Sequence, residues 1–372
     1  MRLPPSIRPA LTSFERARRA AYGRVLGAAC ATAIAAWTPT AGAQAAGGGP
    51  AVRVRAGACT DTGAAAVPSA VVPGLAAGPH SFIANGVRQW YCVAGRTSAA
   101  AAGVPAPVIF LHGGPGQGSY HFAALNGPSL EATLRLVYYD QRGSGHSERP
   151  ANRAYSLPLM VDDIEALRQA LGVPRVALLA HSFAGALALE YAAKYPEHVA
   201  RMVLYDAISD VPASSRSQCE ALAQADSAAY ARSGPNGARP ASPAECSVFR
   251  GLSGPAVQAF FRANMFPDTT VSVRLDSVAA ASGMRNTGEM SGVLFGRGGL
   301  SDWRFAASGR LTMPVLVIVG ARDRQVGLEP PRDLARGLPN ARLLVYERSG
   351  HYPNLDEPAR FTRDVAAFLG VP

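Results

Sequence analysis

The stretch LLAHSFAGALALEY, residues 178–191, decides the fold, because an apolar run passes through a single serine into a helical pattern. The run RVALLA (175–180) predicts a strand that ends just before Ser182, and the spacing over 183–195 predicts a helix. A sharp strand–turn–helix holds such a serine in a strained conformation with its hydroxyl exposed. Ser182 is therefore a candidate nucleophile.

The residues flanking this serine differ from the usual motif, G-x-S-x-G, because both glycines are replaced, by Ala180 and Ala184. Strand and helix nearly touch at such a turn, so the flanking side chains must be small. Alanine is the smallest substitute, and Gly185 leaves further room. Taken alone, the stretch fits a helix N-cap serine equally well.

Further apolar runs alternate with helical patterns along the chain. Asn85-Gly86 between two apolar stretches predicts a β-hairpin over 80–95. The alternation predicts an α/β fold, with a mostly parallel central sheet and helices on both faces. The expected strands cover 107–113, 134–140, 200–207, 313–320 and 341–347, and further helices are expected over 159–171 and 358–370.

The alternation is interrupted once. Residues 208–304 contain Pro, Gly and Ser clusters with short helical patterns, which predicts a helical cap inserted into the fold. The core then consists of residues 79–207 and 305–372. Residues 44–78, rich in Ala, Gly and Pro, are expected to form a linker or N-terminal extension.

Residues 1–43 have the pattern of an export signal. Several arginines precede the apolar run VLGAACATAIAAW (25–37), and AGA (41–43) offers a cleavage site. The apolar run is too short to span a bilayer comfortably, which favours cleavage over anchoring. We expect a periplasmic or secreted protein with no membrane segment after cleavage, and the choice between Sec and twin-arginine export stays open.

The charge of the chain is concentrated in that signal. The formal net charge is +10, and residues 1–43 hold six arginines and one acid, so about +5 remains on the rest. No block of like charges is left, which argues against nucleic-acid binding.

Four cysteines follow the signal, namely Cys59, Cys92, Cys219 and Cys246. An even number in an oxidising compartment predicts two disulfides. Of three possible pairings, Cys59–Cys92 with Cys219–Cys246 is the simplest, and four free buried thiols are the alternative. No Cys or His lies at metal-ligand spacing, so no metal is expected.

Two further residues complete a possible catalytic set. Asp323 lies just past the run 313–320, and His351 lies just past the run 341–347. Histidine is the natural base near neutral pH, and an aspartate can orient it. Each could be an ordinary loop residue, but all three follow predicted strands in the order Ser, Asp, His.

A glycine-rich loop, LHGGPGQG (111–118), follows the first central strand. Its backbone can approach a substrate closely and present N–H groups to an oxyanion, together with the N–H of Phe183. A phosphate-binding loop is the alternative. No Lys-Ser/Thr follows, however, and Pro115 lacks an N–H donor.

Four motifs together resemble the proline iminopeptidase group of α/β-hydrolases, which includes the tricorn-interacting aminopeptidases. The resemblance covers most of residues 80–372 and implies the α/β-hydrolase fold with Ser182, Asp323 and His351 as catalytic triad. It also implies Gly114 and Phe183 N–H groups as oxyanion hole, with Asp140 and Arg142 bracing the loop beneath. The motifs are HGGPG (112–116), YYDQRGSGHSERP (138–150), HSFAGALALEYAAKYPEHV (181–199) and GHYPNLDEP (350–358).

The resemblance extends into the predicted cap. MRNTGEM (284–290) is similar to a segment whose glutamate binds the free N-terminal amine of the substrate, which implies that role for Glu289. One departure concerns the residue after the triad aspartate. The family has a second glutamate there, whereas this chain has Arg324, which could repel an ammonium or neutralise Glu289.

These observations predict an exported serine hydrolase that needs no cofactor. The specific expectation is an aminopeptidase of the proline iminopeptidase type, releasing N-terminal residues from short peptides through an acyl-enzyme. The alternative is a carboxylesterase or lactonase acting on small acyl substrates. A non-catalytic binding module on the same fold is a different class, and such proteins usually lack a triad member. The sequence does not indicate an oligomeric state.

Overall fold

The computed structural model describes residues 59–60, 74–96, 105–284, 286–296 and 298–370. The predicted export signal, 1–43, lies outside the described residues, as does most of the predicted extension, 44–78. None of the helices in the described ranges is long and apolar enough to cross a bilayer.

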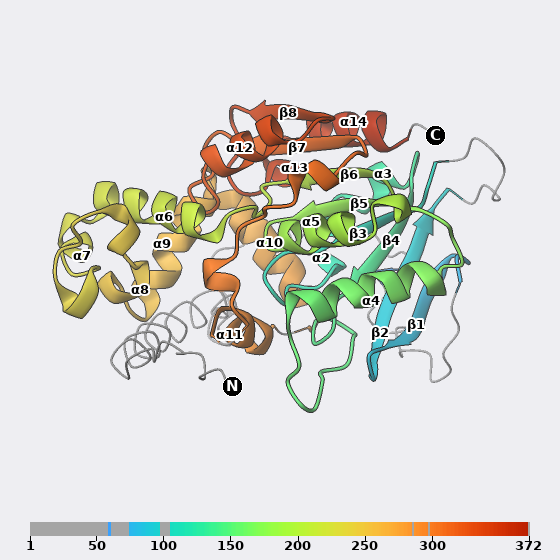
Figure 1. The fold of residues 1–372 in the computed structure, drawn as a ribbon, viewed down its shortest axis with the longest axis horizontal. Coiled ribbons are helices and arrows are strands. Elements are labelled where there is room, and N and C mark those ends of the chain that lie inside the picture. The colour runs from blue at the N-terminus through green and yellow to red at the C-terminus, as the bar shows by residue number, and fades with distance from the viewer. Residues whose placement is uncertain (1–58, 61–73, 97–104, 285, 297, 371–372) are drawn as a thin grey trace, which may run out of the picture.

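The described core is built on an eight-stranded sheet with the order β1-β2-β4-β3-β5-β6-β7-β8 (Figure 1). β1 and β2 form the predicted hairpin, and β2 runs antiparallel to β4. All pairs from β4 through β3 to β8 are parallel, so the expected mostly parallel sheet is confirmed. The strands are β1 (Gly78–Ala84), β2 (Val87–Gly95), β3 (Val108–Leu111), β4 (Arg135–Asp140), β5 (Val176–His181), β6 (Val199–Tyr205), β7 (Val315–Gly320) and β8 (Ala341–Tyr346).

Helices cover both faces of the sheet, which explains why the central strands are apolar throughout. Every residue of β3, β5 and β7 is buried, as expected of strands covered on both sides. One face packs on α4 (Leu157–Ala170), α5 (Ala184–Lys194) and α12 (Glu329–Gly337). The other face packs on α2 (Tyr120–Leu125), α3 (Gly127–Leu130) and α14 (Pro358–Leu369).

The helix start at α4 shows how local sequence sets an element. Helical spacing predicts this helix from residue 159, but it begins at Leu157. The Ser156 hydroxyl accepts from the Leu159 backbone N–H at 3.4 Å, and Pro158 lies in the first turn, where a missing N–H costs nothing. The cap residue therefore extends the helix beyond its apolar pattern.

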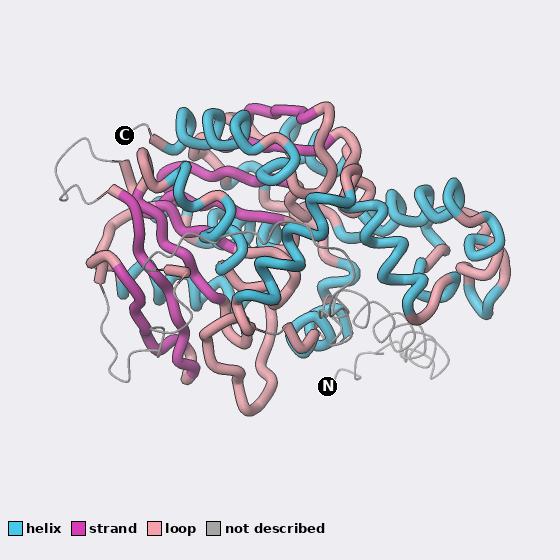
Figure 2. The backbone as a smooth tube through the Cα atoms, turned by 180° about the vertical axis from the view of Figure 1, so that it is seen from behind, coloured by secondary structure: helices cyan, strands magenta, loops and turns pink. Residues whose placement is uncertain are grey.

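The chain between β6 and β7 forms what we call the inserted segment, residues 208–304. Figures 1 and 2 show its first helices projecting from the sheet, with α10 and α11 lying nearer to it. The projecting part has its own apolar core. Its helices are α6 (Val211–Ala225), α7 (Ser227–Tyr230), α8 (Val248–Gly251), α9 (Pro255–Met265), α10 (Thr269–Ala281) and α11 (Glu289–Gly296), and α13 (Pro353–Asp356) follows β8.

Two disulfides join the four cysteines in the simplest predicted pairing. Cys59 bonds to Cys92 on β2, and Cys219 on α6 bonds to Cys246. The first fixes a residue of the N-terminal extension to the sheet, and the second closes a loop within the inserted segment. The alternative of four free thiols is wrong.

Candidate active site

The structure brings Ser182, His351 and Asp323 together at the carboxyl edge of the parallel strands. Nε2 of His351 lies 2.9 Å from the Ser182 hydroxyl oxygen. Nδ1 of the same ring lies 2.9 Å from Oδ2 of Asp323. All three side chains are buried, with Ser182 the most accessible at 7%. The residues come from the ends of β5, β8 and β7, so the shared edge of a parallel sheet assembles them.

The backbone at Ser182 has the conformation that a sharp strand-to-helix turn requires. Its φ angle is +54°, in the left-handed region that non-glycine residues seldom occupy. The Ser182 carbonyl accepts from the N–H groups of Gly185 and Ile208, at 2.9 and 2.8 Å. A Cβ on Gly185 would lie 2.6 Å from the Cβ of Ala207. A side chain at position 185 would therefore clash with the start of the inserted segment, whereas position 184 carries a buried alanine.

The donors around Asp323 fix the tautomer of His351. Oδ1 of Asp323 accepts from the backbone N–H groups of Gln325 and Val326, at 2.7 and 3.1 Å. Oδ2 is then left to accept from Nδ1 of His351, which places the imidazole proton there. Nε2 is consequently a free acceptor for the Ser182 hydroxyl. This arrangement suits a general base.

The glycine-rich loop after β3 lies against the nucleophile turn. A Cβ on Gly113 would lie 3.0 Å from the Cβ of Ser182, so a larger residue there would press on the nucleophile turn. Gly114 follows with φ +117°. The other predicted donor, Phe183, is fully buried and directly precedes α5. The two predicted oxyanion residues therefore belong to segments that meet at Ser182.

Two loops that carry triad residues are hydrogen-bonded to the inserted segment. The His351 backbone N–H donates to the Met265 carbonyl at 2.9 Å, and the Arg324 N–H donates to the Asn264 carbonyl at 3.2 Å. Both acceptors lie at the end of α9. The inserted segment thus supports the loops that hold the base and the acid.

A second histidine, His181, lies directly beside the triad. Its Nε2 lies 2.9 Å from the His351 carbonyl, and its ring centroid lies 4.9 Å from that of His351. Burial lowers the pKa of His181 well below the usual range, so the ring is neutral and donates from Nε2. Sequence reasoning did not single out His181, and its only signal was a polar residue at the end of an apolar strand.

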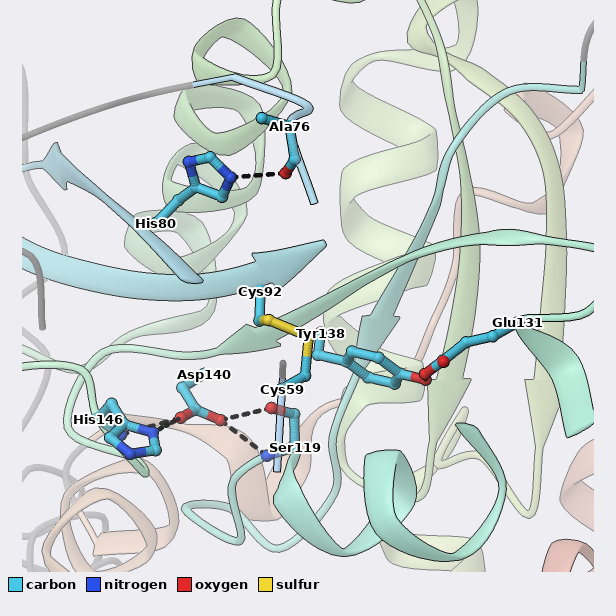
Figure 3. The surroundings of a disulfide bond; sticks show 9 residues. All are labelled: Cys59, Ala76, His80, Cys92, Ser119, Glu131, Tyr138, Asp140 and His146. Atoms are coloured by element: carbon cyan, nitrogen blue, oxygen red, sulfur yellow. Dashed lines mark hydrogen bonds and ion pairs between the residues drawn. A yellow bond between two sulfur atoms is a disulfide. The ribbon is translucent and has the colours of Figure 1, made fainter. Parts of the chain in front are cut away.

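Asp140 and Arg142 brace the loops below the site, as predicted. Figure 3 shows Asp140, near the Cys59–Cys92 disulfide, between Ser119 and His146. It accepts from the Ser119 N–H at 2.7 Å and from the His146 N–H at 2.9 Å. Burial alone would raise the pKa of Asp140, but the hydrogen bonds and charge of His146 outweigh it and lower the pKa. Arg142 is 1% exposed and pairs with buried Asp163 through both ends of its guanidinium.

Glu289 lies in a different environment from the triad. Its Oε1 accepts from the Tyr155 hydroxyl at 2.7 Å, and its Oε2 lies 3.6 Å from Nε of Arg153. The Glu289 side chain stays 26% exposed. Arg324 is exposed and reaches the Gln224 side chain on α6 instead, at 3.5 Å. The arginine paired with Glu289 is therefore Arg153, not Arg324.

One more carboxyl, Asp206, lies at the triad. It follows β6, and one of its carboxyl oxygens lies within 4.8 Å of a carboxyl oxygen of Asp323 and of a ring nitrogen of His351. This is a possible ligand set for a metal ion. However, Nδ1 of His351 and Oδ2 of Asp323 are hydrogen-bonded to each other, so these residues suit proton transfer better than metal binding. Sequence reasoning missed Asp206, whose signal was a lone acid at the end of the run RMVLYD.

The sequence and the architecture match a known family. A family model for the alpha/beta hydrolase fold matches residues 106–358. The chain belongs to the α/β-hydrolase fold family, and the predicted fold class is confirmed.

Individual relatives divide between two kinds of hydrolase. The chain is 27% identical over 285 residues to 2-hydroxymuconate semialdehyde hydrolase of Pseudomonas sp. (strain CF600), covering 74% of this chain and 90% of that protein. It is 26% identical over 277 residues to proline iminopeptidase of Lactobacillus delbrueckii subsp. lactis, covering 71% and 90%. The crystal structure of a proline iminopeptidase-related protein from Thermus thermophilus superposes with TM-score 0.63 at 25% identity, covering 78% and 96%. The chain is therefore a hydrolase, and its relatives leave the substrate open.

Proposed function

We propose that the chain is a serine hydrolase that works through an acyl-enzyme. The observation that carries this proposal is the continuous hydrogen-bonded chain from Ser182 through His351 to Asp323, with 2.9 Å at both links. A nucleophile, a base and a group that orients the base are the parts that acyl transfer requires.

The proposed reaction runs in the following steps. The Ser182 oxygen attacks the substrate carbonyl carbon while Nε2 of His351 takes its proton. Asp323 stabilises the imidazolium, and the N–H groups of Gly114 and Phe183 receive the negative charge on the carbonyl oxygen. The tetrahedral intermediate collapses as His351 returns the proton to the leaving group. Water, activated by His351, then attacks the acyl-enzyme and releases the acid.

The substrate class that we propose is a short peptide with a free N-terminal amine. Glu289 presents a partly exposed carboxylate, held by the Tyr155 hydroxyl, which could pair with an ammonium. Asn286, three residues earlier, donates to the Pro115 carbonyl of the glycine-rich loop at 3.0 Å, so this segment lies over that loop. The proline iminopeptidase relatives support the same substrate class.

A second candidate is a carboxylesterase or lactonase. Arg153 and Tyr155 between them contact both oxygens of Glu289, which reduces the negative charge available to an amine. Arg324 also stands where the resemblance has a second glutamate. Both observations favour a small acyl substrate without an amine.

Two measurements test these proposals. A fluorophosphonate probe should label wild-type protein and leave a Ser182→Ala variant unlabelled. No labelling, or equal labelling of both, would defeat the serine hydrolase proposal. Rates on proline-, alanine- and leucine-arylamides are then compared with rates on short-chain aryl esters. Turnover of esters alone would defeat the aminopeptidase proposal and leave the esterase.

We also propose that the protein is exported to the periplasm or secreted. The arginine-rich start and apolar run of residues 1–43 support this location. Two disulfides that join all four cysteines of the rest of the chain support an oxidising compartment. Mass spectrometry of protein purified from the culture fluid or periplasm should find a mature N-terminus near residue 44.

A further inference from the structure

Asp206 occupies a buried and conformationally constrained position beside the triad acid, Asp323. It follows β6, which pairs directly with β7, the strand that leads to Asp323. Its backbone N–H donates to the Ile318 carbonyl at 2.9 Å, and its φ angle is +41°. A non-glycine residue in this region is uncommon and marks a local constraint. The side chain is 0% exposed.

The hydrogen bonds of the Asp206 carboxyl group are incomplete unless it carries a proton. Oδ1 accepts from the Gly320 N–H at 2.9 Å. Oδ2 is buried and has no hydrogen-bond partner among the described residues, and a carboxyl oxygen of Asp206 lies within 4.8 Å of a carboxyl oxygen of Asp323. Two ionised carboxylates are both acceptors and repel each other. The contact is favourable only when one of them is protonated.

The donors around the two carboxyls decide which one holds that proton. Asp323 accepts from the N–H groups of Gln325 and Val326 and from Nδ1 of His351, and such donors favour the charged form. Among the described residues, the Asp206 carboxyl group accepts only from the Gly320 N–H. Burial, and then the charge of Asp323, raises the pKa of Asp206 well above its usual range. Asp356 acts in the same direction.

We propose that Asp206 is a positioning residue of the triad, which donates a hydrogen bond from its protonated carboxyl group to Asp323 and replaces Asp323 as the acid when that residue is neutralised. This inference rests on the proposed serine hydrolase mechanism. In wild-type protein the Asp206 hydroxyl fixes the carboxylate that orients His351.

The replacement role follows from distance and charge. A carboxyl oxygen of Asp206 lies within 4.8 Å of a ring nitrogen of His351. Asp323→Asn removes the negative charge that keeps Asp206 protonated, so Asp206 ionises more readily. A ring nitrogen of His351 lies within the same 4.8 Å, and the charge of Asp356 also raises the pKa of Asp206. A small shift then brings the Asp206 carboxylate to the imidazolium.

The test measures the rate of fluorophosphonate labelling from pH 5 to pH 9. The variants are Asp206→Asn, Asp206→Leu, Asp323→Asn and the double Asp206→Asn/Asp323→Asn. Asp333→Asn, at an exposed position of α12, is the matched control for exchanging a carboxyl for an amide. Loss of the only triad carboxylate lowers rates about 10⁴-fold in a serine protease, so a reserve acid should limit the loss in Asp323→Asn to about 10²-fold.

The expected pattern separates positioning from a merely structural role. Asp206→Asn keeps an amide donor toward Asp323 and should lose less than tenfold, whereas Asp206→Leu should lose about 10- to 100-fold, the effect of one hydrogen bond to a charged group. The double variant should label at least about tenfold more slowly than Asp323→Asn, which is a coupling of adjacent groups. That ratio should grow with pH as Asp206 ionises in the single variant.

Other outcomes overturn the inference. Equal rates for Asp323→Asn and the double variant at every pH would remove the replacement role. Equal losses in Asp206→Asn and Asp206→Leu would remove the positioning role, and if the leucine variant does not fold, the double variant alone decides. If the probe labels wild-type protein and either of these two results is found, this inference is refuted but the serine hydrolase proposal is not. Unlabelled wild-type protein refutes both.

Discussion

The Tyr155 hydroxyl donates to Oε1 of Glu289 at 2.7 Å, and this bond ties the inserted segment to the loop that follows β4. Burial, and then the Glu289 hydrogen bond, raises the pKa of Tyr155, so the phenol stays a donor at any working pH. Glu289 is therefore oriented by a permanent donor. A substrate amine could therefore pair with Oε2 of Glu289, which also lies near the exposed side chain of Arg153.

Glu289→Gln tests the amine anchor directly. An arylamide with a free amine should show a KM at least about tenfold higher, since an ion-assisted hydrogen bond contributes roughly 1.5–3 kcal/mol. Rates on neutral aryl esters should change less than twofold. The matched control is Tyr155→Phe, which removes the orienting hydroxyl but leaves the charge on Glu289, and it should raise KM for amine substrates less than Glu289→Gln does. Equal effects of Glu289→Gln on amides and esters would remove the anchor role.

The disulfide within the inserted segment should stabilise it considerably. Cys219 and Cys246 are 27 residues apart, and closing a loop of this size contributes about 3.5 kcal/mol in the chain-entropy model. A Cys219→Ser/Cys246→Ser variant should therefore unfold at lower temperature and lower denaturant concentration than wild-type protein. Reductant should lower the Tm of wild-type protein more than that of the variant. Identical melting of the two proteins under oxidising conditions would contradict this expectation.

Asp356 makes stability depend on pH. Its Oδ2 accepts from the Gly350 N–H at 2.8 Å, and burial raises the pKa of Asp356 to about 6. An unfolded aspartate has a pKa of about 3.9, so the folded state binds the proton more tightly and loses stability as pH rises from about 4 to about 6.

Asp356→Asn removes that loss while keeping an acceptor for Gly350. The variant should be more stable than wild-type protein at pH 8 by about 1 kcal/mol, a figure reduced for the partial exposure of the carboxyl group. The difference should vanish near pH 4. Urea denaturation at the two pH values measures it, and a gain of the same size at both would show that ionisation is not the cause.

Gly185→Ala tests where the nucleophile turn is tight. The new Cβ would lie 2.6 Å from the Cβ of Ala207 and 2.8 Å from backbone atoms of Ile208, none of which can move freely. Such overpacking costs about 1–3 kcal/mol, and displacement of Ser182 should also slow fluorophosphonate labelling. The control is Ala184→Gly, which restores the second glycine of the usual motif and should lose no more than about 1 kcal/mol of helix propensity. A Gly185→Ala protein as stable as wild type would contradict this assignment.

Sequence patterns predicted the core of the fold because its strands are buried on both faces and its helices have one apolar face. The continuous run VALLAH and the Asn85-Gly86 turn each indicate one structure strongly. α12 was not predicted, since EPPRDLARG contains two prolines, which a helix accepts only in its first turn.

The candidate site was predictable to the extent that its residues follow strands. Ser182, Asp323 and His351 each come directly after an apolar run, so the order of the strands indicates that they meet. Asp206 also follows an apolar run, but the sequence analysis had already assigned the role of triad acid to Asp323. The partners of Glu289 depend on how the inserted segment folds over the loop after β4, and no local pattern reports such a contact.

The bond from the His351 N–H to the Met265 carbonyl limits how this protein could be given a new specificity. A foreign lid grafted in place of the whole inserted segment would lose the carbonyls of Asn264 and Met265, and with them the anchor of two catalytic loops. Exchange should succeed only with grafts that end before Asn264 or reproduce its backbone path.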